Sequence, residues 1–536
     1  MTGDSVSFAQ RWPPWLEPMA WCALCVVAAI APVARQRLPR LRNDSFQYLS
    51  AASNLRSTQR MATSFVHFDP ERSHGTIPSP LTWFPPGYPV AIAAVSMLGC
   101  SYETAALLVS IAGFVLVTGG LWWLMRMMDV SIWAARAAVL CWIVNAQALY
   151  YSVAAMSESL FTVFVFASIL FFAKTAEASP GARGWIWWVA SAAMAGLSYW
   201  VRYAGILCVL TFVLILLVQT VFGNKPSWRP ALAAGALPFV VMLPLMIRNV
   251  ILVGDWRGRV NTVGSSSIHD LAVNAPSVFF HLILGDGTVR QLKVPAILIA
   301  IGLIGIGYAT LRSRPANASR VLRLPLTKEG MVLIAFLGYS LGILAIALGS
   351  VLAYTPTRIF VPILPHLIVL TTCGVAGILR NSPKFIGLAI ALCLLLGYTA
   401  GNLISRASPQ PDTRDWTEQA LLGPDGTGHS IKDRLQQELK PGEVIGATNG
   451  QAAGYVLNHP SISLEHNEYN TSNWDEVSLR KELARFGAGH VLVFRNAELD
   501  SDLGESRLLG ALAKCQPPPW LRLVSHNQDV CVYQVQ

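Results

Sequence analysis

Long apolar runs separated by short polar segments fill the first three quarters of the chain. A helix needs about 20 predominantly apolar residues to cross the hydrocarbon core of a bilayer. Eleven runs approach that length, so the pattern predicts a polytopic α-helical membrane protein with about 11 transmembrane helices. The predicted spans are residues 17–34, 104–124, 133–153, 158–174, 185–201, 204–222, 231–252, 291–311, 330–352, 359–379 and 385–404.

After residue 405 the pattern changes to short β-like runs that alternate with a helical stretch, which favours a small α/β domain. We therefore predict a membrane part over residues 1–405 and a C-terminal α/β domain over residues 406–536, with the polar segment 406–441 as the connection. The β-like runs are Val444–Thr448, His490–Phe494 and Val530–Val535, and the helical run is Ser478–Phe486.

Composition supports this division. Hydrophobic residues make up 53% of the chain and charged residues only 13%, about half of what a soluble protein carries. That excludes a soluble enzyme, a disordered chain and a nucleic-acid-binding protein. Residues 1–405 contain 28 Lys and Arg against 13 Asp and Glu, a net charge of +15, whereas residues 406–536 contain 12 against 17, a net charge of −5.

The basic residues also predict an orientation, because cytoplasmic connections of membrane proteins carry an excess of Lys and Arg. With a cytoplasmic N-terminus, five such charges lie in the inner connection 312–328. An odd number of spans then places the C-terminal domain outside. We predict a multi-pass protein of the bacterial cytoplasmic membrane, and no cleavable signal peptide, because the first apolar run ends in Arg35-Gln36-Arg37.

The first outer loop, residues 35–86, departs from that rule because it contains seven arginines. Three explanations remain open: the orientation is reversed, the arginines bind anionic headgroups of membrane lipids, or they attract a phosphorylated lipid. The arginines are Arg35, Arg37, Arg40, Arg42, Arg56, Arg60 and Arg72.

Ionisable residues at the ends of apolar helices are costly and are therefore functional candidates. Asp44 directly follows the first span, and Glu158 begins the fourth. A carboxylate can take a proton from an acceptor hydroxyl or amine, so both are candidate catalytic residues, with Asp44 the preferred base. The alternative for each is a helix cap, contributed by Asp44 itself and by Ser157 or Glu158.

A second group of candidates could bind a phosphate. Arg202-Tyr203, Arg248 and Arg358 lie at predicted outer helix ends, and the guanidinium group matches phosphate geometry. If these arginines converge, they would hold the phosphate of a lipid donor. The alternative for each is that it extends toward the membrane interface.

Other chemistry is not indicated. Neither GxGxxG nor GxxxxGK[ST] occurs, which argues against a nucleotide as the direct donor, so we predict no cofactor. A divalent metal is not indicated, because the loop residues His67, Asp69, Glu71 and His74 match no standard spacing. Cys515 and Cys531 flank a Pro-rich turn in the domain placed outside, and we predict that they form a disulfide.

Several short motifs, in order along the predicted topology, resemble the GT-C superfamily of polyprenyl-phosphate-dependent glycosyltransferases. More narrowly, the chain resembles the bacterial relatives of protein O-mannosyltransferases and aminoarabinose transferases. The motifs are Asn43-Asp44-Ser45, Trp83-Phe84-Pro85-Pro86-Gly87-Tyr88-Pro89, Met156-Ser157-Glu158-Ser159, Arg202-Tyr203-Ala204-Gly205, Arg248-Asn249 with Gly254, and Arg358 with Pro362.

The resemblance implies an inverting transfer of a sugar from a polyprenyl-phosphate donor to a glycan, lipid or protein acceptor at the outer membrane face. Asp44 matches the first-loop acid of the family and would be the general base, and Arg202, Arg248 and Arg358 would stabilise the departing phosphate. Two departures are visible. Asp44 stands without a neighbouring second acid, and the Lys of the aminoarabinose branch is absent after Phe84.

Two other classes of protein remain open. One is an oligosaccharide transferase or ligase that uses a pyrophosphate-linked glycan. The other is a transporter of lipid-linked sugars, which should show internal repeats or broken helices with charges at the membrane midplane. Here the polar residues gather at outer helix ends, which favours chemistry at the membrane surface.

Overall fold

The computed structural model describes most of the chain. The described residues are 15–31, 38–66, 73, 75–175, 182–222, 228–258, 281–284, 293, 328–349, 356–381, 384–407, 412–424, 429–464, 474–495 and 506–536. The predicted span 291–311 lies outside the described residues, apart from Lys293.

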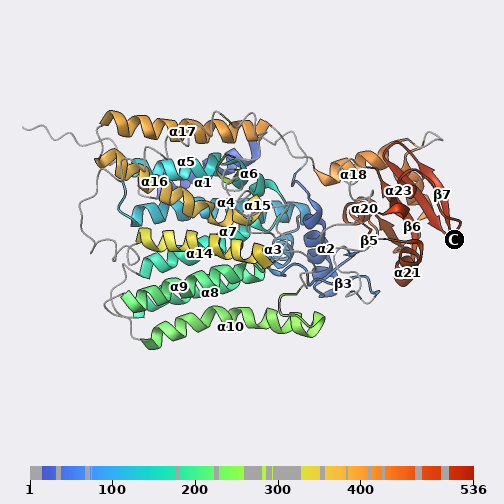
Figure 1. The fold of residues 1–536 in the computed structure, drawn as a ribbon, viewed down its shortest axis with the longest axis horizontal. Helices are drawn as coiled ribbons and strands as arrows, with labels where there is room; N and C mark the ends of the chain where they lie inside the picture. The colour runs from blue at the N-terminus through green and yellow to red at the C-terminus, as the bar shows by residue number, and fades with distance from the viewer. Residues whose placement is uncertain are drawn as a thin grey trace, which may run out of the picture.

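The apolar runs form helices that lie side by side in one bundle (Figure 1). By length and composition, five of the described helices are able to cross a membrane, and the number rises to six if a bent pair is counted as one span. The bundle helices are α1 (Leu16–Ile30), α4 (Tyr102–Met127), α5 (Ile132–Val144), α6 (Ala146–Val153), α7 (Glu158–Thr175), α8 (Ala182–Val201), α9 (Gly205–Phe222), α10 (Trp228–Val253), α14 (Lys328–Gly349), α16 (Leu364–Asn381) and α17 (Lys384–Ala407).

The predicted span 133–153 forms two helices rather than one, because α5 and α6 meet at an angle of 56°. Asn145 lies between them with an extended backbone, and its side chain accepts a hydrogen bond from the Ala148 amide. An Asn in this conformation starts a new helix rather than continuing the old one. Asn402 of α17 then accepts a bond from the Ala146 amide, which satisfies a second group at the break.

The first loop folds at the end of the bundle that faces the C-terminal region (Figure 1). A helix begins in this loop at Asn43, next to Asp44. The elements of the loop are α2 (Asn43–Thr58), β1 (Ala62–Thr63), β2 (Phe65–Val66) and β3 (Ser79–Pro80), and α3 (Gly87–Ser96) follows the loop.

The C-terminal region contains a six-stranded sheet in the order β2-β5-β4-β6-β8-β7. The four strands from β2 to β6 run parallel, and β8 and β7 are antiparallel to their neighbours. The three strands and the helix predicted from the sequence are confirmed. The elements are β4 (Val444–Ala447), α20 (Gly450–Leu457), β5 (Ser461–Ser463), α21 (Glu476–Phe486), β6 (Ala488–Phe494), α23 (Arg507–Ala513), β7 (Leu521–His526) and β8 (Val530–Val535).

The sheet contains one strand that does not belong to the C-terminal region. Phe65 and Val66 of the first loop form β2 and pair with Ser461 and Ile462 of β5. Gln47 of α2 donates to the Phe65 carbonyl at 2.6 Å, which ties the strand to the loop helix. The sheet therefore joins the two parts of the chain.

The segment 406–441 is more than the predicted connection, because it contains helices α18 (Thr413–Leu422) and α19 (Ile431–Glu438). Each helix begins at a capping side chain. Asp412 accepts a hydrogen bond from the Arg414 amide, and Ser430 accepts one from the Asp433 amide. Asp and Ser are preferred at this position because they satisfy amides that have no partner within the helix.

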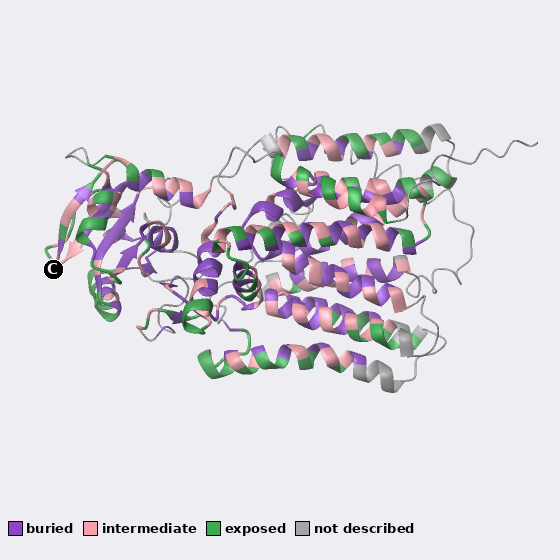
Figure 2. Ribbon diagram, turned by 180° about the vertical axis from the view of Figure 1, so that it is seen from behind, coloured by how far each residue is buried: buried purple, intermediate pink, exposed green. Residues whose placement is uncertain are grey.

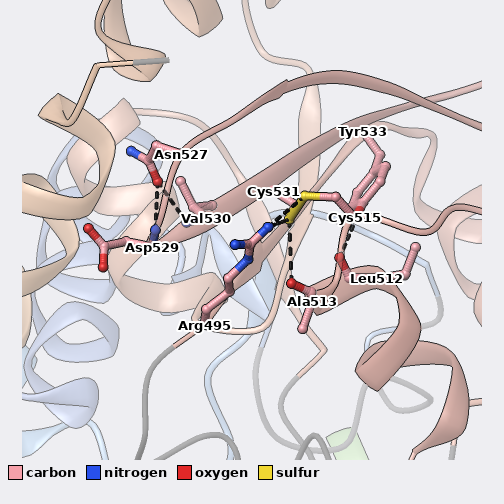
Figure 3. The surroundings of a disulfide bond; sticks show 9 residues. All are labelled: Arg495, Leu512, Ala513, Cys515, Asn527, Asp529, Val530, Cys531 and Tyr533. Atoms are coloured by element: carbon pink, nitrogen blue, oxygen red, sulfur yellow. Dashed lines mark hydrogen bonds between the residues drawn. A yellow bond between two sulfur atoms is a disulfide. The ribbon is translucent and has the colours of Figure 1, made fainter. Parts of the chain in front are cut away.

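The predicted disulfide between Cys515 and Cys531 is confirmed, with the two Cα atoms 5.9 Å apart. It connects the end of α23 to β8 (Figure 3). Arg495, just after β6, donates to both sulfur atoms, at 2.7 and 2.8 Å.

Buried residues follow the centre of the bundle and the sheet, whereas α10 and α17 expose much of their length (Figure 2). Helix α7 packs between α4 and α8. Gly113 permits this packing, because a Cβ atom there would lie 3.0 Å from the Ser159 backbone. The close approach fixes the start of α7, where Glu158 lies.

Candidate active site

Asp44 lies in the first turn of α2, at the end of the bundle nearest the C-terminal region. Arg42, and not Asp44, holds the N-cap position, so the predicted capping role is not the one observed. A carboxylate in the first helical turn is stabilised by the helix dipole. The side chain is 12% exposed, and its Oδ2 atom accepts a hydrogen bond from Arg358 Nη2 at 2.7 Å.

Glu158 begins α7 and is fully buried. Its Oε1 atom accepts a hydrogen bond from Arg202 Nη1 at 2.5 Å and lies 3.6 Å from Arg358 Nε. Its Oε2 atom is buried and has no hydrogen-bond partner among the described residues. The two predicted carboxylates are therefore connected through the arginine that they share.

The two arginines are positioned by breaks in helices. Arg202 lies in the turn between α8 and α9, where Gly205 is required because a Cβ atom would lie 2.3 Å from the Tyr199 amide nitrogen. Arg358 lies on α15 (Pro356–Phe360), which continues through the short 3-10 helix η5 (Val361–Ile363) into α16. Pro362 in η5 sets the start of that turn, because proline favours the first positions of a helix.

Two hydroxyl groups complete the cluster. Ser157 accepts a hydrogen bond from Arg202 Nη1 at 3.1 Å, and the Tyr48 hydroxyl lies 3.2 Å from Ser157 Oγ. Both side chains are buried. Tyr48 was missed in the sequence, although it lies four residues after Asp44 on α2 and therefore on the same helix face.

Arg248 and Tyr203 make different contacts. Arg248 Nη2 donates to the Leu81 carbonyl at 2.9 Å, and the Tyr203 hydroxyl donates to the Thr82 carbonyl at 2.7 Å. Asn249 donates to the Tyr203 hydroxyl at 3.0 Å. In the hydrogen bonds found for the described residues, these side chains hold the end of the first loop, whereas Arg202 and Arg358 hold the carboxylates.

The cluster is electrically balanced. Asp44 and Glu158 contribute two negative charges, and Arg202 and Arg358 contribute two positive charges, so the sum is zero. Charges in a largely apolar surrounding are retained when they are paired and hydrogen-bonded. An anion that binds the arginines would compete with the carboxylates for them, and a carboxylate released in this way would be able to accept a proton.

Within the described ranges, no group of three or more His, Cys, Asp or Glu side chains is arranged to hold a metal ion. The loop residues considered as metal ligands, His67, Asp69, Glu71 and His74, lie outside these ranges.

No protein-family model matches the sequence, and no curated protein matches it. Solved structures do. ArnT from Cupriavidus metallidurans is 13% identical, with a TM-score of 0.57 and 97% of both chains covered. The same protein bound to undecaprenyl phosphate gives a TM-score of 0.55, with 97% of this chain and 98% of that chain covered. The chain has the GT-C fold.

Other proteins with the GT-C fold support this assignment. The archaeal oligosaccharyltransferase AglB from Archaeoglobus fulgidus is 13% identical, with a TM-score of 0.55 over 90% of this chain and 70% of that one. Arabinofuranosyltransferase AftD from Mycobacteria is 14% identical, with a TM-score of 0.54 over 98% of this chain and 40% of that one. The GT-C fold of the predicted resemblance is thus confirmed.

Proposed function

We propose that this protein is an integral-membrane glycosyltransferase that moves one sugar from a polyprenyl-phosphate donor to an acceptor at the outer face of the cytoplasmic membrane. One observation carries the proposal. Within a GT-C fold, two arginines and two carboxylates meet in one partly open cluster at the end of the bundle that faces the C-terminal region.

In the proposed reaction, Arg202 and Arg358 bind the phosphate of the donor. An acceptor oxygen or nitrogen attacks the anomeric carbon from the face opposite the phosphate, so the configuration inverts. The carbon–oxygen bond to the phosphate breaks, and the arginines stabilise the charge that develops on the leaving group. Asp44 takes the proton of the acceptor.

The ion pairs suggest how the steps are ordered. Arg358 donates a hydrogen bond to Asp44. A donor phosphate on Arg358 weakens that bond and leaves the Asp44 carboxylate available to the acceptor. In this scheme Arg248 and Tyr203 act indirectly, because they hold the first loop beside the cluster.

The donor is proposed from the cluster together with the fold. ArnT was solved bound to undecaprenyl phosphate, and AglB was solved with an inhibitory peptide and a dolichol-phosphate. A lipid carrier with one phosphate suits the two arginines of the cluster. A transfer of a whole oligosaccharide from a pyrophosphate carrier is the alternative, and the mass of the transferred glycan separates the two.

The proposal also fixes an orientation in the membrane, with the first loop and the C-terminal region outside. Reporter fusions at Ser64, Ser319 and Ser430 should read outside, inside and outside. A cytoplasmic reading at Ser430 would place the cluster on the wrong side for surface chemistry.

The decisive experiment compares envelope glycans and glycoproteins by mass spectrometry in cells that lack the gene and carry either the wild type or a variant. Asp44→Asn keeps the size of the side chain but removes the base, which is typically worth 10²–10⁴-fold in rate. The glycan that depends on the wild type should therefore be lost. Asp129→Asn is the matched control, because Asp129 is exposed in the turn after α4.

Glu158→Gln tests the competing base. If Asp44→Asn retains the glycan and Glu158→Gln loses it, Glu158 is the base. If both variants retain it at normal expression, the proposed chemistry is wrong.

A further inference from the structure

A second ion cluster lies outside the candidate active site, where the C-terminal region meets the membrane part. Its centre is Arg414 of α18, which is only 1% exposed. The guanidinium group lies 3.1 Å from Glu103, 3.4 Å from Asp412 and 3.3 Å from Asp415. It also donates to the Pro39 carbonyl at 3.4 Å.

These partners come from separate parts of the chain. Glu103 lies in the first turn of α4 in the bundle, and Pro39 precedes α2 in the first loop. The second carboxylate oxygen of Glu103 accepts a hydrogen bond from the Tyr455 hydroxyl of α20. Arg414 therefore joins the bundle, the first loop and the C-terminal region at one point.

The cluster continues by hydrogen bonds toward Asp44. The Leu41 amide donates to Asp412 Oδ2 at 3.0 Å, and the Thr413 amide donates to the Leu41 carbonyl at 3.1 Å. Leu41 is three residues before Asp44. The backbone that starts α2 is thus held by the same aspartate that pairs with Arg414.

The same stretch of backbone is bonded to the segment that leads to Glu158. The Arg40 amide donates to the Val153 carbonyl at 3.0 Å, and the Ala155 amide donates to the Arg40 carbonyl at 3.0 Å. Ala155 is three residues before Glu158. One short segment, Pro39–Leu41, therefore lies between Arg414 and both carboxylates of the candidate active site.

Stability alone explains this arrangement poorly. Arg414 is buried, whereas its partners Glu103 and Asp415 are 23% and 41% exposed. Pairing a buried charge is often no more stabilising than apolar side chains of similar volume, because the buried charge loses its hydration. Such a cluster does fix the relative orientation of its members, because a guanidinium group with several acceptors has one orientation that satisfies them all.

We infer that Arg414 is a positioning residue through which the C-terminal region fixes the segment Pro39–Leu41, and with it the placement of Asp44 and Glu158. The catalytic consequence rests on the proposed function. The mechanical link does not, because it concerns only the order of the backbone.

The test uses the full-length protein in lipid nanodiscs and hydrogen–deuterium exchange of a peptide that covers residues 38–48. Arg414→Met should speed exchange in this peptide about tenfold or more, because hydrogen bonds to a charged group are lost beside it. Arg414→Lys keeps the positive charge but lacks the planar guanidinium group with its several donors, so it should speed exchange in this peptide less. Exchange in α8 and α9 should stay at the wild-type rate in both variants.

The same variants are scored for the glycan product in cells. A displacement of the carboxylates of about 1 Å can lower the rate about 10²-fold, so Arg414→Met should lose most of the product. Binding of undecaprenyl phosphate, measured by native mass spectrometry, should stay near the wild-type value, since Arg202 and Arg358 are intact. A variant that merely unfolds would lose both the glycan product and the binding of undecaprenyl phosphate.

Arg434→Met is the matched control, because Arg434 forms its ion pair with Glu438 of the same helix, α19, at 3.1 Å and partly exposed to solvent. It should change neither readout. Unchanged exchange at residues 38–48 in both Arg414 variants overturns the inference, and so does faster exchange with a wild-type level of product. If Arg414→Met also speeds exchange in α8 and α9, its effect is not confined to the segment. The inference is then judged on exchange at residues 38–48 in the Arg414→Lys variant. Failure of the proposed function is visible separately, as retained product in Asp44→Asn.

Discussion

Replacing Arg358 with Met tests whether the ion pairs of the candidate active site are as strongly coupled as their burial suggests. Arg358 lies 2.7 Å from Asp44 and 3.6 Å from Glu158, and its side chain is 25% exposed. Its loss leaves two carboxylates beside one arginine, a net charge of −1. Removing one partner of a buried pair costs about 3–5 kcal/mol, and the partial exposure favours the lower end of that range.

The double variant Asp44→Asn with Arg358→Met restores the balance, because Glu158 and Arg202 remain as a pair. Its free energy of unfolding should therefore recover most of the loss. The coupling energy between Asp44 and Arg358 should be about 1.5–3 kcal/mol, the range for a hydrogen bond to a charged group. Unfolding of the wild type, the two single variants and the double variant in mixed detergent micelles gives this number.

A second ion pair provides the comparison. Arg136 and Glu17 are also 2.7 Å apart, but their side chains are 32% and 30% exposed. Pairs of this kind contribute about 0–1 kcal/mol. If the coupling of Asp44 with Arg358 is no larger than that of Glu17 with Arg136, the cluster is solvated, and burial does not set its strength.

Three further predictions concern other parts of the protein. Replacing both Cys515 and Cys531 with Ala should lower the free energy of unfolding of the C-terminal region by about 3 kcal/mol in a denaturant titration, as the chain-entropy model gives for a loop of about 15 residues. Burial raises the pKa of Glu443, but the Lys440 amide and His490 outweigh it and hold this pKa below 4.5. The C-terminal region should therefore lose stability in thermal scans as the pH falls below 4.5, and Glu443→Gln should flatten that dependence. Tyr48→Phe should lower the glycan product about three- to tenfold, whereas Tyr88→Phe, whose hydroxyl contacts Ser110 instead, should leave it unchanged.

The apolar pattern predicts the helices of the bundle well, because a long apolar run in this chain has few alternatives to a helix. It misses what distant contacts decide. Asn402 supports the break at Asn145 by accepting a hydrogen bond from the Ala146 amide, and β2 forms by pairing of Phe65 with Ser461 in the other part of the chain. Two-residue strands have no pattern of their own, so no reading of the first loop could have placed Phe65 in the C-terminal sheet.

The candidate site shows the same limit at the level of single side chains. The carboxylates of Asp44 and Glu158 were identifiable because acids are scarce in an apolar chain, and a buried carboxylate needs a cation or several donors. An arginine at a helix end has more ways to be satisfied. Arg358 binds Asp44, whereas Arg248 binds the carbonyl groups of the first loop. Both have the same local sequence setting, an arginine at the end of an apolar run, and only the folded chain determines which acceptor lies within reach. Acids therefore mark the candidate site more reliably than arginines do, because backbone carbonyls occur in every loop and buried cations do not.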